Sequence, residues 1–145
     1  MKVVYTIKQV SELMGISAYT LRYYEKIGLL PFVHRDANGV RQFSKRDIVI
    51  LNSIYRLKET GMPLSKIKYY LKLIDQGLDS VSERKELMEQ QKQAVEKRIK
   101  ELQEALVTIN AKVKYYQIAE KEHSLDVCHD DREALIQRLI HEKEE

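Results

Sequence analysis

The chain has 145 residues, of which 43% are hydrophobic and 32% are charged, and its formal net charge is +3 at pH 7. A chain of this size can bury one modest core and carry one extended element besides it. A single cysteine excludes an internal disulfide framework and a CxxC metal pair, and no stretch approaches the ~20 apolar residues of a membrane span. The segment MKVVYTIKQ has no signal-peptide apolar core, so we expect a cytoplasmic protein that contacts no membrane.

A helix-turn-helix is predicted at the start of the chain. Thr6-Ile-Lys-Gln9 is a capping-box pattern, so a helix should begin at Thr6. Gly15 can turn with positive φ and ends that helix. Ser17 then caps a second helix, which ends at Gly28.

The second predicted helix carries cations and aromatic hydroxyls. Leu21 and the ring of Tyr24 can face inward at helical spacing. The outward surface is then shared by Tyr19, Thr20, Arg22 and Tyr23. Periodicity does not decide which of the adjacent tyrosines, Tyr23 or Tyr24, points outward. Such a surface suits a groove of duplex DNA and its phosphates.

A compact hairpin is predicted next. Pro31 ends any helical continuation, and Asn38-Gly39 is the strongest short-range hairpin signal. This turn lies between two cations, Arg35 and Arg41. A basic hairpin beside a cationic helix predicts a winged DNA-binding head.

The charge distribution agrees with a basic head. Residues 1–77 hold 13 Lys and Arg against 6 Asp and Glu, whereas residues 78–145 hold 12 against 16. This division is expected for a head that neutralises phosphates and a tail that does not touch them. The alternative is an ordinary solvated charged face.

Two further helices are predicted before a much longer one. Ser44-Lys-Arg-Asp47 is a cap that opens a helix ending at Gly61. Pro63 lies where an N1 proline begins the next helix, which Gly77 closes. Their apolar sides are Ile48, Leu51, Ile54 and Tyr55 in the first, and Ile67, Tyr70, Leu71 and Ile74 in the second.

The longest predicted helix carries a narrow apolar seam. Ser80-Val-Ser-Glu83 is its cap, and no Gly or Pro interrupts residues 83–119. Apolar residues alternate spacings of four and three over about three heptads: Val95, Ile99, Leu102, Leu106, Ile109, Val113 and Tyr116. A small head cannot bury a seam this narrow on a charged helix, so a coiled-coil dimer is predicted. The alternative is a helix packed across its own head.

The elements together predict an all-α fold with a small β-hairpin wing. A winged helix-turn-helix head with its helix pair is expected over residues 1–77, and a long dimerising coiled-coil helix over residues 80–119. A short tail with an amphipathic helix is expected over residues 120–145.

Three phrases resemble the head motifs of the MerR family of transcription regulators: TIKQVSELMGIS, TLRYYEKIGLL and NGVRQFS. The resemblance covers residues 4–118, and ALVTINAKVKYYQ looks most like the short members related to aldehyde- and electrophile-responsive regulators. It implies an antiparallel homodimer on promoters whose two polymerase-recognition elements are spaced too far apart. The dimer would bend and untwist this DNA, so double-stranded promoter DNA is the direct partner and RNA polymerase an indirect one. No cofactor is expected.

The resemblance also assigns DNA contacts. They fall on Ser17, Tyr19, Thr20, Arg22, Tyr23 and Tyr24 in the recognition helix and on Arg35, Asn38, Gly39 and Arg41 in the wing. Arg22 is expected to contact a base edge in the major groove, because its planar fork fits guanine. Tyr23, Arg35 and Arg41 are expected mainly to hold phosphates.

Cys128 is the one candidate sensor. It lies near His123 and Asp126 and directly before His129, but this set lacks the repeated spacing of a zinc site, so no metal site is predicted. The chain also lacks the cysteines that the family's metal and electrophile sensors carry at the start of the long helix and after the wing. Cys128 is therefore interpreted as a plain tail residue, with a redox sensor as the second reading and a metal sensor as the least favoured one.

No catalytic motif is present in the sequence: there is no glycine-rich phosphate loop, GxSxG or HExxH, so an enzyme is not expected. Two functions remain open. The first is a sequence-specific, DNA-binding transcription regulator that distorts promoter DNA in response to a chemical or small-molecule signal. The second is an architectural DNA-binding or adaptor dimer without an effector. A pocket or reactive group between the tail and the coiled coil would favour the first.

Overall fold

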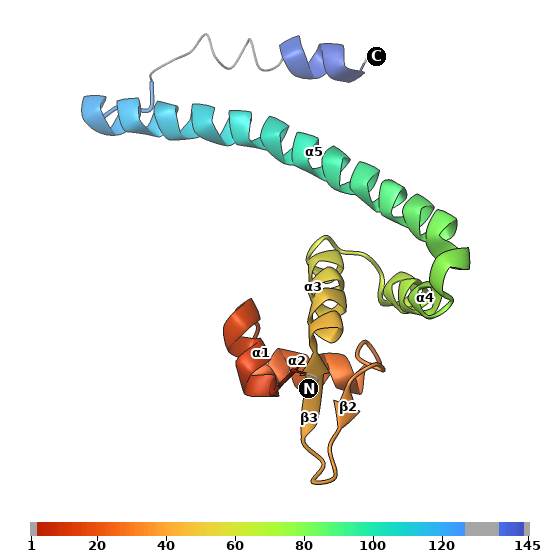
Figure 1. The fold of residues 1–145 in the computed structure, drawn as a ribbon. Helices are drawn as coiled ribbons and strands as arrows, with labels where there is room; N and C mark the ends of the chain where they lie inside the picture. The colour runs from red at the N-terminus through yellow and green to blue at the C-terminus, as the bar shows by residue number, and fades with distance from the viewer. Residues whose placement is uncertain (1–2, 127–136, 144–145) are drawn as a thin grey trace. The chain divides into compact units, whose positions relative to one another are not determined.

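The computed structural model describes residues 3–126 and 137–143 (Figure 1). The chain forms two compact units, Met1–Val95 and Glu96–Glu145. The fold is mostly helical with one small antiparallel sheet, which confirms the predicted fold class. The predicted domain boundaries at residues 77 and 119 stay predictions.

The described elements follow one another as β1 (Val4–Tyr5), α1 (Ile7–Met14), α2 (Ala18–Lys26), β2 (His34–Arg35), β3 (Arg41–Ser44), α3 (Lys45–Glu59), α4 (Leu64–Asp75), the 3-10 turn η1 (Gly77–Ser80) and α5 (Val81–Glu122). Residues 137–143 are also helical. The strand order is β1-β3-β2, with Val4 opposite Ser44 and Arg35 opposite Arg41. Sequence patterns did not predict β1, because two residues are too few to show an alternation.

The predicted helix starts at Thr6 and Ser44 are confirmed. The Thr6 hydroxyl accepts from the Gln9 N–H at 3.2 Å, and the Gln9 side chain accepts from the Thr6 N–H at 2.8 Å. Ser44 and Asp47 form a second reciprocal pair at the start of α3. Each pair satisfies backbone donors that the first helical turn leaves without partners. Gly15 has the positive φ of 67° that the turn after α1 requires.

Two helix caps, at Pro63 and Ser80, differ from the ones predicted from the sequence. Pro63 is the N-cap of α4 and not its first helical residue, because the helix begins at Leu64. Ser80 is buried, and its hydroxyl donates to the carbonyl oxygens of Leu73 and Gly77, the latter at 2.9 Å. Ser80 therefore ties η1 back to the end of α4 and does not make the predicted forward capping box with α5.

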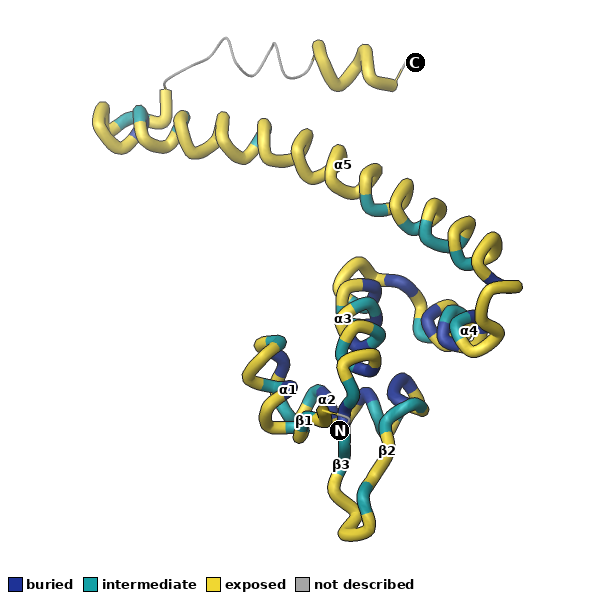
Figure 2. The backbone as a smooth tube through the Cα atoms, viewed as in Figure 1, coloured by how far each residue is buried: buried dark blue, intermediate teal, exposed yellow. Residues whose placement is uncertain are grey.

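The hydrophobic core lies in the unit that ends at Val95. Its most deeply buried members are Val10, Leu21, Leu29, Phe43, Leu51, Ile54 and Ile67. Leu87 and Met88 from the first turns of α5 pack against this core, and the Gln91 amide donates to the Thr60 hydroxyl at 2.8 Å. The start of α5 thus belongs to the head. Figure 2 shows the buried segments concentrated in α1 to α4.

Candidate nucleic-acid interface

Helix α2 buries one side and exposes the other. Leu21 and Tyr24 lie in the core, whereas Tyr19 and Tyr23 are 80% and 48% exposed. Arg22 is exposed beside them. The structure therefore decides what periodicity could not: of the two adjacent tyrosines, Tyr23 points outward and Tyr24 inward.

The burial of Tyr24 bears on its predicted contact with DNA. Its side chain is 6% exposed, and burial raises the pKa of its hydroxyl, with smaller contributions from Tyr55, Glu59 and Tyr23. The Tyr23 and Tyr24 rings lie 6.4 Å apart, centroid to centroid. Its ring fills the core under α2, and the predicted DNA contact of Tyr24 stays a prediction that would involve only the small exposed part of the side chain.

Ser17 and Thr20 form the start of α2. The Ser17 hydroxyl accepts from the Thr20 N–H at 3.1 Å and lies 2.8 Å from the Thr20 hydroxyl. Ser17 is therefore the predicted N-cap, and it is exposed.

The tip of the wing is organised by Asp36. One carboxylate oxygen of Asp36 accepts from the N–H groups of Asn38 and Val40, each at 2.9 Å. The Asp36 N–H donates to the Val40 carbonyl at 2.8 Å, and Gly39 adopts φ 77°. Asn38 and Gly39 are exposed at this tip, which confirms the predicted turn. Asp36 itself was not predicted, although an aspartate opening a turn is a known signal.

Glu25, near the end of α2, joins both wing arginines. Arg35 Nη2 lies 2.7 Å from Glu25 Oε1, and Arg41 Nε donates to Glu25 Oε2. Arg35 Nη1 also donates to the Gly39 carbonyl at 3.2 Å. Because Arg35 and Arg41 are directly opposite each other across β2 and β3, they lie on the same face and one carboxylate reaches both.

This three-residue cluster is partly shielded from solvent. The side chains of Glu25 and Arg41 are 26% and 22% exposed. Burial alone would raise the pKa of Glu25, but the hydrogen bonds and charges of Arg41 and Arg35 outweigh it and lower the pKa below its ordinary value. Glu25 is therefore ionised at neutral pH. Sequence reasoning missed this residue, although it is the only acid in α2.

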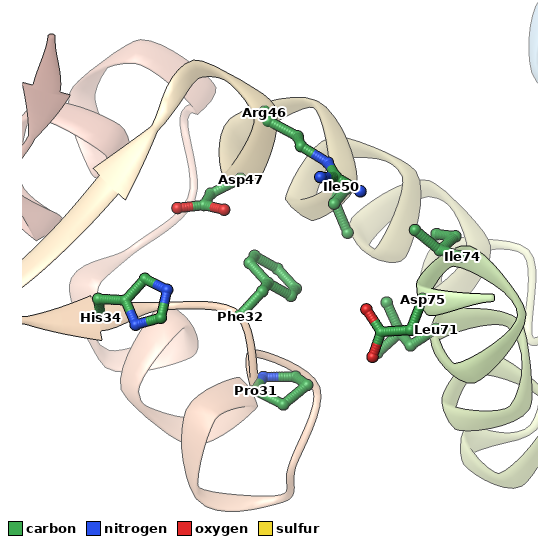
Figure 3. Close-up of a pocket in the computed structure, with 9 residues that line it drawn as sticks. All are labelled: Pro31, Phe32, His34, Arg46, Asp47, Ile50, Leu71, Ile74 and Asp75. Carbon is green, nitrogen blue, oxygen red and sulfur yellow. The ribbon is translucent and has the colours of Figure 1, made fainter. Parts of the chain in front are cut away.

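A pocket of about 340 Å³ lies beside the wing (Figure 3). Phe32 and His34 line it from the wing side, Arg46 and Ile50 from α3, and Asp75 from the end of α4. Figure 3 shows the Phe32 ring between the His34 and Ile50 side chains. The volume falls in the range of small-molecule pockets, roughly 300–1,000 Å³.

The predicted seam on α5 is uncovered. In the unit Glu96–Glu145, six of its members are between 48% and 57% exposed: Ile99, Leu102, Leu106, Ile109, Val113 and Tyr116. Val95, the last residue of the head unit, is half-buried. Figure 2 shows this part of α5 exposed along nearly its whole length. Within the described residues of this unit, the seam side chains are thus about half exposed, and the partner that covers them stays a prediction.

The end of α5 closes with a turn. His123 has φ 49°, and the Ser124 N–H donates to the Ala119 carbonyl at 3.1 Å, an arrangement that satisfies a terminal carbonyl. A shallow hollow of about 380 Å³ follows, lined in part by Tyr116 and Leu125.

The candidate sensor segment has no structural description. Cys128 and His129 lie outside the described residues. Among the residues that are described, no group of histidine, cysteine and acidic side chains could hold a metal ion. The described helices include none that is long and apolar enough to cross a membrane.

Comparisons with known proteins agree on one family. Residues 5–74 match the model for MerR HTH family regulatory proteins, and residues 48–111 match the model described as "MerR, DNA binding". An uncharacterized HTH-type transcriptional regulator of Haemophilus influenzae is 43% identical over 115 residues, which are 79% of this chain and 85% of that protein.

Solved structures give the same result. The structure of HiNmlR, a MerR family regulator lacking the sensor domain, bound to promoter DNA, is 41% identical with a TM-score of 0.79. The match covers 85% of this chain and 93% of that one. A MerR family regulator from Bacillus thuringiensis is 35% identical with a TM-score of 0.74, over 77% of this chain and 98% of its own.

Proposed function

The chain belongs to the MerR family of helix-turn-helix regulators, and we propose that it binds promoter DNA as a homodimer and controls transcription by distorting that DNA in response to a chemical or small-molecule signal. The observation that carries DNA binding is the exposed face of α2 beside a wing that Glu25 joins to the same helix.

The exposed face of α2 is proposed to enter the major groove. Arg22 donates two hydrogen bonds to a guanine edge, while Tyr19, Thr20 and Tyr23 contact the adjoining backbone. Ser17 and the N-terminus of α2 that it caps favour a phosphate at the helix start. The Tyr24 ring packs in the core under the same helix, so any contact that Tyr24 makes with DNA would come from its hydroxyl end.

The wing is proposed to contact phosphates on the neighbouring backbone. Asn38 and Gly39 lie at its exposed tip, where the backbone can approach a phosphate closely. Arg35 and Arg41 keep N–H donors besides those that Glu25 uses, because a guanidinium has five. Both arginines can therefore reach a phosphate while they remain bonded to Glu25.

A second copy of the chain is proposed to cover the α5 seam. Six apolar side chains about half exposed on one helix are unfavourable in water, and an antiparallel partner would present the same seam in return. A two-fold dimer also places two heads on two half-sites, as a palindromic operator requires. RNA polymerase would meet this dimer only through the DNA between them.

The signal response needs a place for an effector. The pocket beside the wing and the hollow at the end of α5 are candidate places within the described residues. Cys128, outside those residues, is the alternative if the signal is an oxidant or electrophile.

The decisive experiment is transcription from the protein's own upstream region after footprinting has located the operator. Addition of aldehydes, thiol oxidants or metal ions should change transcription while the footprint persists. Shortening the spacer between the two polymerase-recognition elements to its usual length should make transcription independent of the protein, or turn the protein into a repressor. Unchanged activation on the shortened promoter contradicts distortion.

A second candidate is an architectural or adaptor dimer without an effector. It is favoured by the similarity to a regulator that lacks a sensor domain and is bound to promoter DNA. In that case the operator should be occupied and the transcription level should stay the same for every compound in the panel.

A further inference from the structure

The outer part of the wing has no hydrophobic anchor. None of residues 34–42 is buried, whereas Phe43, the next residue of β3, is completely buried. Phe43 is therefore the point at which the hairpin leaves the hydrophobic core. Packing of buried apolar side chains does not fix the orientation of residues 34–42. A two-stranded hairpin is marginally stable by itself in water, so another interaction must hold it.

The Glu25 cluster supplies this interaction. One carboxylate receives Arg35 from β2 and Arg41 from β3, which lie 10 and 16 residues along the chain. The two strands are thereby joined to the last turn of α2, the helix that is proposed to enter the groove. A single exposed salt bridge contributes little, but a shared, partly shielded carboxylate constrains both strands at once.

The same contact limits the charge that the wing offers to DNA. Two free arginines would attract any phosphate backbone, whatever its sequence. Glu25 pairs with both arginines, so its negative charge offsets part of that attraction at every duplex. An operator that fits the wing and α2 together keeps its contacts, whereas a random duplex that meets the arginines alone is held less firmly.

We infer that Glu25 is a positioning residue that fixes the wing against α2 and thereby raises the preference of the protein for its operator over random duplex DNA. This inference rests on the proposed function, because it presupposes that α2 and the wing contact one duplex together.

The test is a titration of the full-length protein with its footprinted operator and with a random duplex of equal length, across a series of salt concentrations. Glu25→Gln keeps the side-chain size and removes the charge. It should raise the affinity for random duplex about threefold or more and steepen the salt slope by about one, because the released arginines neutralise a further phosphate. The operator-to-random ratio should fall at least about fivefold. An unchanged ratio overturns the inference.

The variant Glu25→Asp distinguishes the effect of the carboxylate's position from the effect of its charge. The aspartate keeps the negative charge but is one methylene shorter, so it cannot bond both arginines as Glu25 does. Affinity for random duplex should stay close to that of the wild type, while affinity for the operator falls. Wild-type operator binding by Glu25→Asp shows that the geometry is unimportant and overturns the positioning role. This variant also keeps the inference testable if Glu25→Gln unfolds.

Two further variants control for net charge and for the route of the effect. Glu12→Gln makes the same charge change at an exposed position on α1 that bonds neither arginine, and it should leave the ratio unchanged. In an Arg35→Gln, Arg41→Gln background, Glu25→Gln should have no further effect on the ratio. An equal loss of preference in Glu12→Gln, or an undiminished effect of Glu25→Gln in that background, contradicts the inference.

Failure of the inference can be told from failure of the proposed function. A wild-type protein that binds operator and random duplex alike contradicts the proposed function. A wild-type protein that prefers its operator, with the same preference in Glu25→Gln, contradicts only the role of Glu25.

Discussion

The head and the distal part of α5 use similar apolar residues to opposite effect. In the head, Phe43, Leu51 and Ile67 are completely buried, because helices and strands surround them on several sides. In the described part of Glu96–Glu145, Ala119 is the only buried residue, and the seam faces solvent. Isoleucine and leucine side chains are not buried merely because they are apolar, since a single helix cannot cover its own apolar stripe. One region buries its apolar side chains within one chain, and for the other we propose a second chain.

The largest expected effect comes from charge on the seam. Replacing Leu102 and Leu106 by glutamate should abolish dimers, because four negative charges would meet in an apolar interface, and specific DNA binding should be lost with them. Light scattering coupled to size-exclusion chromatography measures the mass, and an operator titration measures the binding.

The matched control for this variant is Val107→Glu. Val107 is 57% exposed on the same helix but stands outside the seam, so dimers should persist. A well-folded wild-type monomer at micromolar concentration would contradict the comparison between the two regions.

The next largest effect should be confined to the head. Phe43→Ala removes a completely buried ring and should lower the free energy of unfolding of the head by about 3–5 kcal/mol. Ile99→Ala, on the exposed seam, should weaken self-association and leave the head unchanged. Amide hydrogen exchange distinguishes the two variants, because the protection of the head and that of α5 are measured separately. Equal loss of head protection in both variants would mean that the head is not complete without the dimer.

A smaller effect is expected where the head recognises DNA. Arg22→Ala should cost about 1–3 kcal/mol of operator binding and relax specificity at one position in each half-site. The loss should leave dimers intact, because Arg22 belongs to the head alone. The measurement is a titration with operators substituted one base pair at a time. Equal weakening on operator and random duplex would show that Arg22 does not contact a base.

The smallest effect is expected at Cys128, a residue that sequence analysis places beyond the seam. Cys128→Ser should leave operator affinity within about twofold, under ~0.5 kcal/mol. Induction by an electrophile or oxidant should then be compared between wild type and Cys128→Ser. Loss of induction in the variant identifies a thiol sensor, while equal responses, or none in either protein, exclude one.

Elements whose signals are local could be predicted from the sequence alone. Capping pairs at Thr6 and Ser44, the Asn38-Gly39 turn and the heptad stripe each lie within a few residues of the structure that they specify, so pattern and propensity suffice. The family and the fold class followed from the same local motifs, and both are confirmed. The DNA contacts and the dimer stay predictions, because they depend on partners outside the chain.

Contacts between side chains that lie far apart in the sequence depend on how the elements pack, and sequence patterns did not predict them. Periodicity left Tyr23 and Tyr24 equivalent, and the core beneath α2 separated them. Glu25 was not predicted as a site residue, because Arg35 and Arg41 become its neighbours only when β2 and β3 pair and bring both arginines to α2. Ser80 was predicted to cap α5, but its hydroxyl donates to the carbonyl oxygens of Leu73 in α4 and Gly77 in η1. In each case the deciding contact joins residues that local sequence patterns do not relate.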